Sequence, residues 1–207
     1  KNCILKKLIE TPEDKYSSTL LLASAAFSND EDFKWFLEGN GKRMFINALN
    51  EHSQQSLNAA LIFATKVPIQ FIGIIESYVE TIVGLLDDTQ PISNGIVLQI
   101  LTRFTSASRD KYKNRISEVL LSLDPSAIVS DAMFKSFSQL ILDYFPSIKA
   151  KVLEAQDPTK YCKHFASFIS GDYEVNSNFV NYIIGLFTST AEMKKKTIPD
   201  LIKSILR

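Results

Sequence analysis

The sequence predicts an all-α fold in which helical units of similar size repeat and stack on one another, and three observations support this prediction. Apolar residues recur at spacings of three and four along most of the 207 residues, as they do on one face of an α-helix. Helix-start signals precede these segments, and no bounded run alternates between apolar and polar residues as a strand would. Similar segment ends also return at a nearly constant interval.

Capping residues mark where the predicted helices begin. Thr11 and Pro12 supply a cap and a first-turn proline, and Asn29 precedes a run of acids that suits the positive end of a helix. Further caps are Ser53, Asp124, Ser130 and Asp157. The predicted helices span residues 12–27, 30–38, 42–50, 54–66, 69–87, 91–105, 110–123, 126–145, 147–155, 158–169, 175–189 and 197–206.

Two local features lie in the second and third of these helices. Trp35 lies between Phe33 and Phe36 on a short amphipathic segment, so we expect all three rings to pack in the core. Gly39 and Gly41 interrupt the pattern immediately afterwards. We expect a tight bend there, because glycine adopts positive φ without steric cost.

The recurring segment end defines the repeat. The last apolar residue before a polar turn falls at Leu49, Leu86, Leu123, Ile169 and Leu206, at intervals of 37, 37, 46 and 37 residues. The longest interval contains an additional short helix within residues 146–157. A unit with apolar stripes on more than one side cannot bury them alone, whereas stacked units bury them in one continuous core. The alternative is a single irregular helical domain in which the period is accidental.

Residues 29–67, NDEDFKWFLEGNGKRMFINALNEHSQQSLNAALIFATKV, resemble one armadillo-type repeat. A short helix (FKWFLE) meets a bend (GNG), a second helix (RMFINAL) follows, and a third helix (SLNAALIFA) carries small residues that permit close packing. The later units resemble the two-helix HEAT type. The resemblance implies a right-handed α-solenoid of armadillo/HEAT-like repeats, in which residues 1–207 form a single repeat domain that we expect to be a fragment of a longer chain.

Other repeat classes fit less well. Tetratricopeptide repeats have a period of about 34 residues and a signature that is missing here. PUF-type RNA-binding repeats require a basic groove and stacking side chains in each unit.

The resemblance also implies a function, because the inner helix of each armadillo-like unit presents side chains to an extended partner peptide. We therefore predict a non-catalytic scaffold or adaptor that binds another protein through a peptide or a helix. Amide and arginine side chains can satisfy the unpaired backbone groups of such a partner. The predicted partner-binding residues are Asn58, Gln99, Arg103, Lys135, Gln139, Asn178 and Asn181. The alternative is a regulatory domain that positions or dimerises a larger enzyme, such as a kinase or a ligase, and terminal repeats are a further candidate for self-association.

Composition argues against several other classes of protein. Acidic and basic residues balance at 23 each, without the basic excess of a nucleic-acid-binding domain. The longest apolar region, residues 67–86, contains one glutamine and two glutamates, so no membrane span is expected. Cys3 and Cys162 are far apart and show no metal-ligand spacing. Their small number indicates a reducing compartment, so we expect a cytoplasmic protein, with a nuclear location as the alternative.

No group of residues predicts catalysis. Cys162 and His164 are two positions apart on a predicted helix, so their side chains point in different directions. A nucleophile and its base must lie within hydrogen-bonding reach. His52 lies in a polar turn, where we expect it to be solvated. The sequence therefore predicts a chain without enzymatic activity, without a cofactor and without a metal site.

Overall fold

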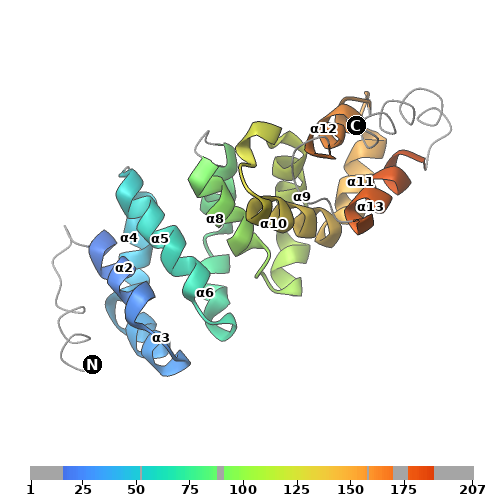
Figure 1. Cartoon of the computed structure of the whole chain (residues 1–207). Helices are drawn as coiled ribbons and strands as arrows, with labels where there is room; N and C mark the ends of the chain where they lie inside the picture. Colours follow the sequence, from blue (N-terminus) through green and yellow to red (C-terminus); the bar gives the residue numbers. More distant parts are fainter. Residues whose placement is uncertain (1–15, 52, 88–90, 158, 170–176, 189–207) are drawn as a thin grey trace.

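The computed structural model describes residues 16–51, 53–87, 91–157, 159–169 and 177–188, and these are helical with no strand (Figure 1). The α-helices are α2 (Tyr16–Ala26), α3 (Asp30–Phe36), α4 (Lys42–Asn50), α5 (Gln54–Lys66), α6 (Ile72–Glu76), α7 (Val79–Gly84), α8 (Pro91–Leu101), α9 (Ser106–Ser122), α10 (Asp131–Asp143), α11 (Phe145–Glu154), α12 (Thr159–Ile169) and α13 (Ser177–Thr188). A π-helical segment, η2 (Leu37–Gly41), and 3₁₀ turns η3 (Ile69–Phe71), η4 (Leu85–Asp87) and η5 (Pro125–Ala127) connect them.

The helices form a two-layered array. One layer is a row of five helices, α2, α5, α8, α10 and α13, in which each packs against the next; we call them the ladder helices. The second layer contains α4, which packs on α5, and α7, α9 and α11, of which α9 contacts both others. Figure 1 shows these helices progressing along the molecule in chain order. The chain thus has the all-α solenoid architecture that the periodicity predicts.

The predicted repeat is confirmed at three of its positions. Leu49, Leu86 and Leu123 are buried at the ends of α4, η4 and α9, and a ladder helix follows each of them. Ile169 is the last residue of α12, and α13 is the next helix along the chain. Leu206 and the predicted helix 197–206 lie outside the described residues. The additional helix within residues 146–157 is α11, and its insertion accounts for the longer interval.

The predicted continuous helix over residues 69–87 is wrong. This stretch is divided into η3, α6, α7 and η4, with the break at Ser77 and Tyr78. The Ser77 amide and hydroxyl both donate to the Gly73 carbonyl, at 3.2 and 2.9 Å, and the Tyr78 amide then donates to the Ile75 carbonyl, only three residues back, at 3.0 Å. The second unit therefore has three helices, like the armadillo-type unit at 29–67, and not the two that the sequence suggests.

Several helices begin at other residues than predicted, because each begins directly after the residue whose side chain caps it. The helix predicted at 126–145 begins only at Asp131, since Ser130 accepts a hydrogen bond from the Met133 amide at 3.4 Å. The helix predicted at 110–123 begins earlier, at Ser106, because Thr105 caps it. The Asn29 cap is confirmed, with its side chain accepting from the Asp32 amide at 2.9 Å.

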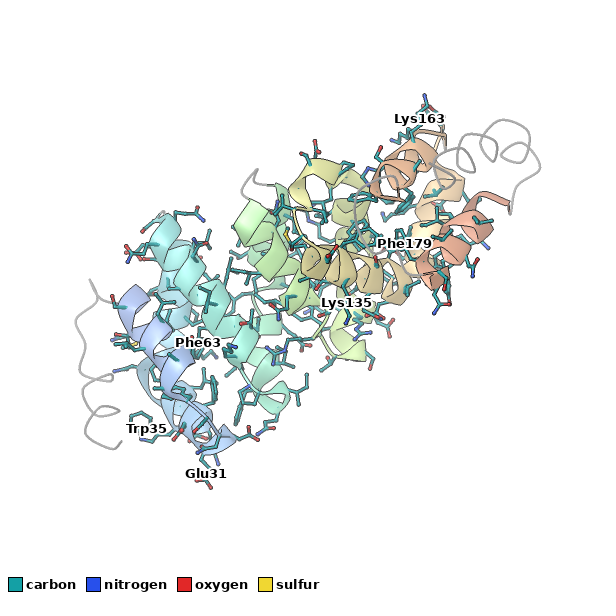
Figure 2. All side chains as sticks on the ribbon, in the orientation of Figure 1. Glu31, Trp35, Phe63, Lys135, Lys163 and Phe179 are labelled. Atoms are coloured by element: carbon teal, nitrogen blue, oxygen red, sulfur yellow. The ribbon has the colours of Figure 1, made fainter. Side chains whose placement is uncertain are left out.

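The two expectations for residues 33–41 are only partly correct. Phe33 and Phe36 are buried, but Trp35 is 38% exposed, because a helix this short turns only one side toward the core (Figure 2). No described glycine has positive φ. Gly41 is needed instead for space, since a Cβ atom there would lie 2.3 Å from Phe36 Cδ1 and 2.6 Å from the Phe36 carbonyl oxygen.

Aromatic side chains pack against one another in the core, both within a unit and between units. Near the N-terminal end, Phe63 of α5 packs edge-on against Phe36, with ring centroids 5.6 Å apart. Toward the other end, Phe137 of α10 stacks on Phe168 of α12 at 4.3 Å, and Phe134 contacts Phe179 of α13 at 5.5 Å. Figure 2 labels Phe63 and Phe179 within these two clusters. Each buried phenylalanine contributes about 1.5–3 kcal/mol through removal of apolar surface from water.

We predict that Phe137→Ala lowers the free energy of unfolding by about 3–5 kcal/mol, because it opens a cavity where α10, α12 and α13 meet. Urea denaturation followed by circular dichroism measures this loss. Leu153→Ala is the matched control, since Leu153 is 40% exposed, and it should change stability by less than about 0.5 kcal/mol. Equal effects from the two substitutions would contradict the packing described.

Candidate functional site

The ladder helices leave part of their surface uncovered. Each inner member of the row packs against a ladder helix on either side and against the second layer, so one face of each helix remains open. Mostly polar side chains spaced by three or four residues lie on this face, which we call the open stripe. Its members are Asn58, Ile62, Thr65, Gln99, Thr102, Arg103, Lys135, Gln139, Asn178, Asn181 and Tyr182, all of them exposed or half-buried.

Every partner-binding residue predicted from the sequence lies on the open stripe, and none is buried. Figure 2 labels Lys135 at the surface of α10. Two of the amides are held by neighbours one turn away. Asn58 accepts a hydrogen bond from Gln54 Nε2 at 3.0 Å, and Gln139 donates to Asp143 Oδ1 at 2.9 Å. These short-range bonds orient the carboxamide groups along their helices. A role for these residues in binding a partner stays a prediction.

Arg103 differs from the other stripe residues. Its guanidinium donates to the Ala64 carbonyl oxygen at 2.8 Å and also to the Val67 carbonyl oxygen, so it ties the end of α5 to the end of α8. Burial lowers the pKa of Arg103 below its ordinary value. A half-buried cation that satisfies helix-terminal carbonyls stabilises the spacing between two units. The sequence gives no signal of this contact, because its acceptors are backbone atoms.

The open stripe has two charged members, Arg103, which donates to backbone carbonyls, and Lys135. On α10 the exposed Asp131 and Lys135 are one turn apart and opposite in sign. Asp143 forms an ion pair with Arg109 at 2.9 Å, and its side chain is only 14% exposed. Carboxamide groups therefore dominate the chemistry of the surface, and each of them can both donate and accept hydrogen bonds.

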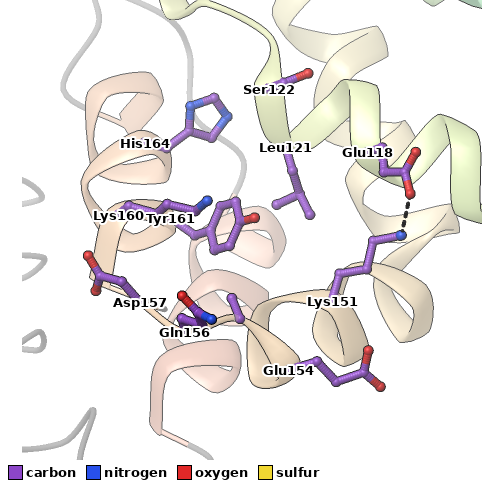
Figure 3. A pocket seen from close by; sticks show the side chains of 11 residues that line it. Glu118, Leu121, Ser122, Lys151, Glu154, Gln156, Asp157, Lys160, Tyr161 and His164 are labelled. Carbon is purple, nitrogen blue, oxygen red and sulfur yellow. Dashed lines mark hydrogen bonds and ion pairs between the residues drawn. The ribbon is translucent and has the colours of Figure 1, made fainter.

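A second candidate site is a hollow of about 820 Å³ in the other layer. Its walls come from α9, α11, α12 and the connection between the last two (Figure 3). His164 lines it, with Nε2 3.4 Å from the Leu120 carbonyl oxygen. Burial lowers the pKa of His164, although the Leu120 carbonyl and the Asp124 carboxylate oppose this effect. The sequence predicts no role for His164. The side chain of Cys162 lies outside the described residues, and so does His52. The sequence feature that points to this hollow is the additional helix predicted within residues 146–157, which is α11 and forms one of its walls.

Within the described parts of the chain, no group of three or more His, Cys, Asp or Glu side chains could hold a metal ion. Across the same residues, none of the helices has the length and apolar character needed to cross a membrane.

Comparison with solved structures identifies the fold. The chain matches the designed armadillo repeat protein YIII(Dq)4CqI with a TM-score of 0.59 and 13% identity, covering 98% of both chains. It matches a second designed armadillo repeat protein, solved in complex with the peptide (KR)4, with a TM-score of 0.58, 13% identity and 98% coverage of both chains. No protein-family model matches the sequence, and a search of curated proteins gives no match. The chain therefore has an armadillo-like helical repeat fold.

We predict that Arg103→Met lowers the free energy of unfolding by about 1–2 kcal/mol, because it leaves the carbonyl groups at the end of α5 without their donors. The aliphatic part of the side chain is retained, so the change isolates the hydrogen bonds. Gln99→Met, on the exposed side of α8, is the control and should alter stability by less than about 0.5 kcal/mol. Thermal or urea unfolding measures both, and an unchanged Arg103→Met protein would show that the contact is not formed.

His164 should make stability depend on pH. Since its pKa is lower in the folded state than in the unfolded state, the folded protein binds fewer protons between the two values. The free energy of unfolding should therefore fall as pH drops below about 6.5, the ordinary histidine value. His164→Gln should weaken this dependence between pH 7.5 and 5, measured by urea denaturation. His52 is common to both proteins, so identical pH profiles would contradict the assignment.

Proposed function

We propose that this chain is a non-catalytic protein-interaction module that binds an extended segment of a partner protein along the open stripe. The observation that carries the proposal is a carboxamide on each of four consecutive ladder helices. Asn58 lies on α5, Gln99 on α8 and Gln139 on α10, and α13 carries Asn178 and Asn181. We infer that the module acts by display of this surface, in a cytoplasmic setting.

The spacing of the ladder suits an extended backbone. Packed helices lie about 8–10 Å apart, and an extended chain rises about 3.3 Å per residue. Successive carboxamides would therefore meet the partner about every third residue. A carboxamide can donate to a carbonyl and accept from an amide, so each contact satisfies backbone groups that an isolated extended peptide leaves unpaired.

The charge of the open stripe limits the kinds of partner segment that suit it. The designed protein solved with (KR)4 holds a basic peptide, whereas here the open stripe itself has no acidic member; beside it on α10, Asp131 lies one turn from Lys135, and Asp143 forms an ion pair with Arg109. A partner segment of mixed or low charge fits this surface better than a polycationic one. Binding of such a segment should change little between low and physiological salt, since few ion pairs are formed.

The test is a selection of peptides from a displayed random library on the immobilised protein, followed by affinity measurement with the selected peptides. The double variant Gln99→Ala, Gln139→Ala should weaken binding by about tenfold or more, since two backbone-directed hydrogen bonds of about 1 kcal/mol each are lost. The matched control is Asn50→Ala, Asn114→Ala, which removes two exposed amides from the second layer. Selected peptides that respond to the control and not to the stripe variant would refute the proposal.

A further inference from the structure

The first ladder helix, α2, lies at one end of the array, and within the described residues the row of ladder helices extends from it in one direction (Figure 1). It packs against α5 and against α4 of the second layer, and Leu20, Ala23 and Phe27 are buried on this side. The other side carries Leu21 and Leu22, which are both exposed, Leu22 to 56%. Contiguous exposed apolar side chains, unlike single ones, mark an interaction surface.

The exposed side of α2 carries large and small side chains in a regular order. Leu21 and Leu22 lie on one turn, and Ala25 and Ala26 lie on the next, with all four exposed. Because residues four apart lie one above the other on a helix, a ridge of leucines is followed by a depression one turn further on. In a second copy of α2 that runs antiparallel, this order is reversed. The leucine pair of each copy then lies over the alanine pair of the other, so the surface is complementary to itself about a two-fold axis.

The charge of α2 is compatible with contact between two copies. Residues 16–26 have the sequence YSSTLLLASAA, which contains no ionisable side chain other than the Tyr16 phenol. Contact between two such helices brings no like charges together and removes no ion from water, which would cost several kcal/mol. By contrast, α3 begins with Asp30, Glu31 and Asp32, so a pair formed through the start of α3 would place carboxylates against carboxylates. The uncharged side of α2 is therefore the part of this end that suits a second copy.

We propose that two copies of this chain associate through α2, as an antiparallel helix pair related by a two-fold axis. The contact gives each α2 the second helical neighbour that the inner ladder helices have, and it joins two arrays end to end. Four side chains of each copy form the centre of the contact, which is smaller than the roughly 800 Å² per partner of a standard interface. The association is therefore weak and increases with protein concentration. It uses α2, whereas the open stripe runs from α5 to α13, so it does not depend on the function proposed for the stripe.

The test is sedimentation velocity of the intact chain over about a hundredfold range of protein concentration, with a reductant present so that the two cysteines cannot form a disulfide. The sedimentation coefficient should rise with concentration toward that of a dimer. The double variant Leu21→Ala, Leu22→Ala removes the ridge and should weaken association at least about tenfold, since each substitution counts twice in a symmetric pair. The matched control Ile69→Ala, Leu153→Ala removes two exposed apolar side chains elsewhere and should leave association unchanged.

An exchange variant separates self-pairing from any other use of this side of α2. The four substitutions Leu21→Ala, Leu22→Ala, Ala25→Leu and Ala26→Leu move the ridge by one turn and leave the composition unchanged. Two copies of the exchanged helix again place leucines over alanines, so association should return to within about threefold of the original; misfolding cannot produce such a recovery.

Three results would overturn the proposal. The first is an intact chain that stays monomeric at every concentration, which is expected if residues 1–15 or a different protein covers this side of α2. The second is a dimer that survives Leu21→Ala, Leu22→Ala. The third is an exchange variant that associates no better than this double variant.

Discussion

The structure depends on the burial of both flanks of each inner ladder helix between its two neighbours. The buried side chains of α5, α8 and α10 form part of one continuous core, and no inner unit could hide this surface alone. Close approach is built into particular positions. At Gly95 of α8 an added Cβ atom would lie 2.8 Å from Met133 Cγ of α10, so the two helices meet where one has no side chain. Stability in such an array comes from interfaces between neighbours.

This constraint also produces the candidate binding surface. Because three sides of each inner ladder helix are occupied, the fourth sides align along the row and receive the residues that packing excludes. The carboxamides of Gln99 and Gln139 lie there because the core accepts apolar side chains at the other positions. Arg103 shows the opposite use of a polar residue, since it fastens the end of α5 to the unit that follows. The same row thus contributes both to the rigidity of the array and to its polar surface.

Much of this architecture follows from helical periodicity, which reports the side of a helix that is buried. Periodicity predicted both ends of α4 and of α5 correctly. It also placed Leu49, Leu86 and Leu123 in equivalent buried positions. Periodicity does not report local changes in the hydrogen-bond pattern, so the break at Ser77 and Tyr78 in the helix predicted over 69–87 was missed. It also does not identify tertiary acceptors. The partners of Arg103 are backbone carbonyls, and the hollow beside His164 arises only from the way α11 displaces α12.

The irregular fourth unit is the most informative departure from the pattern. Insertion of α11 lengthens one interval of the repeat and separates second-layer helices that would otherwise pack together. Glu118, Glu154 and Tyr161 line the hollow at this insertion, which the regular part of the array lacks.

The most direct test of the ladder is an NMR measurement of contact between α8 and α10. The chain has only three methionines, so the Met133 methyl signal is readily assigned by substitution. A Cβ atom at Gly95 would lie 3.3 Å from Met133 Cε, and a strong nuclear Overhauser effect between the Met133 methyl and the Gly95 backbone protons is therefore expected. A Met133 methyl that shows cross-peaks only to residues of α10 would contradict the account.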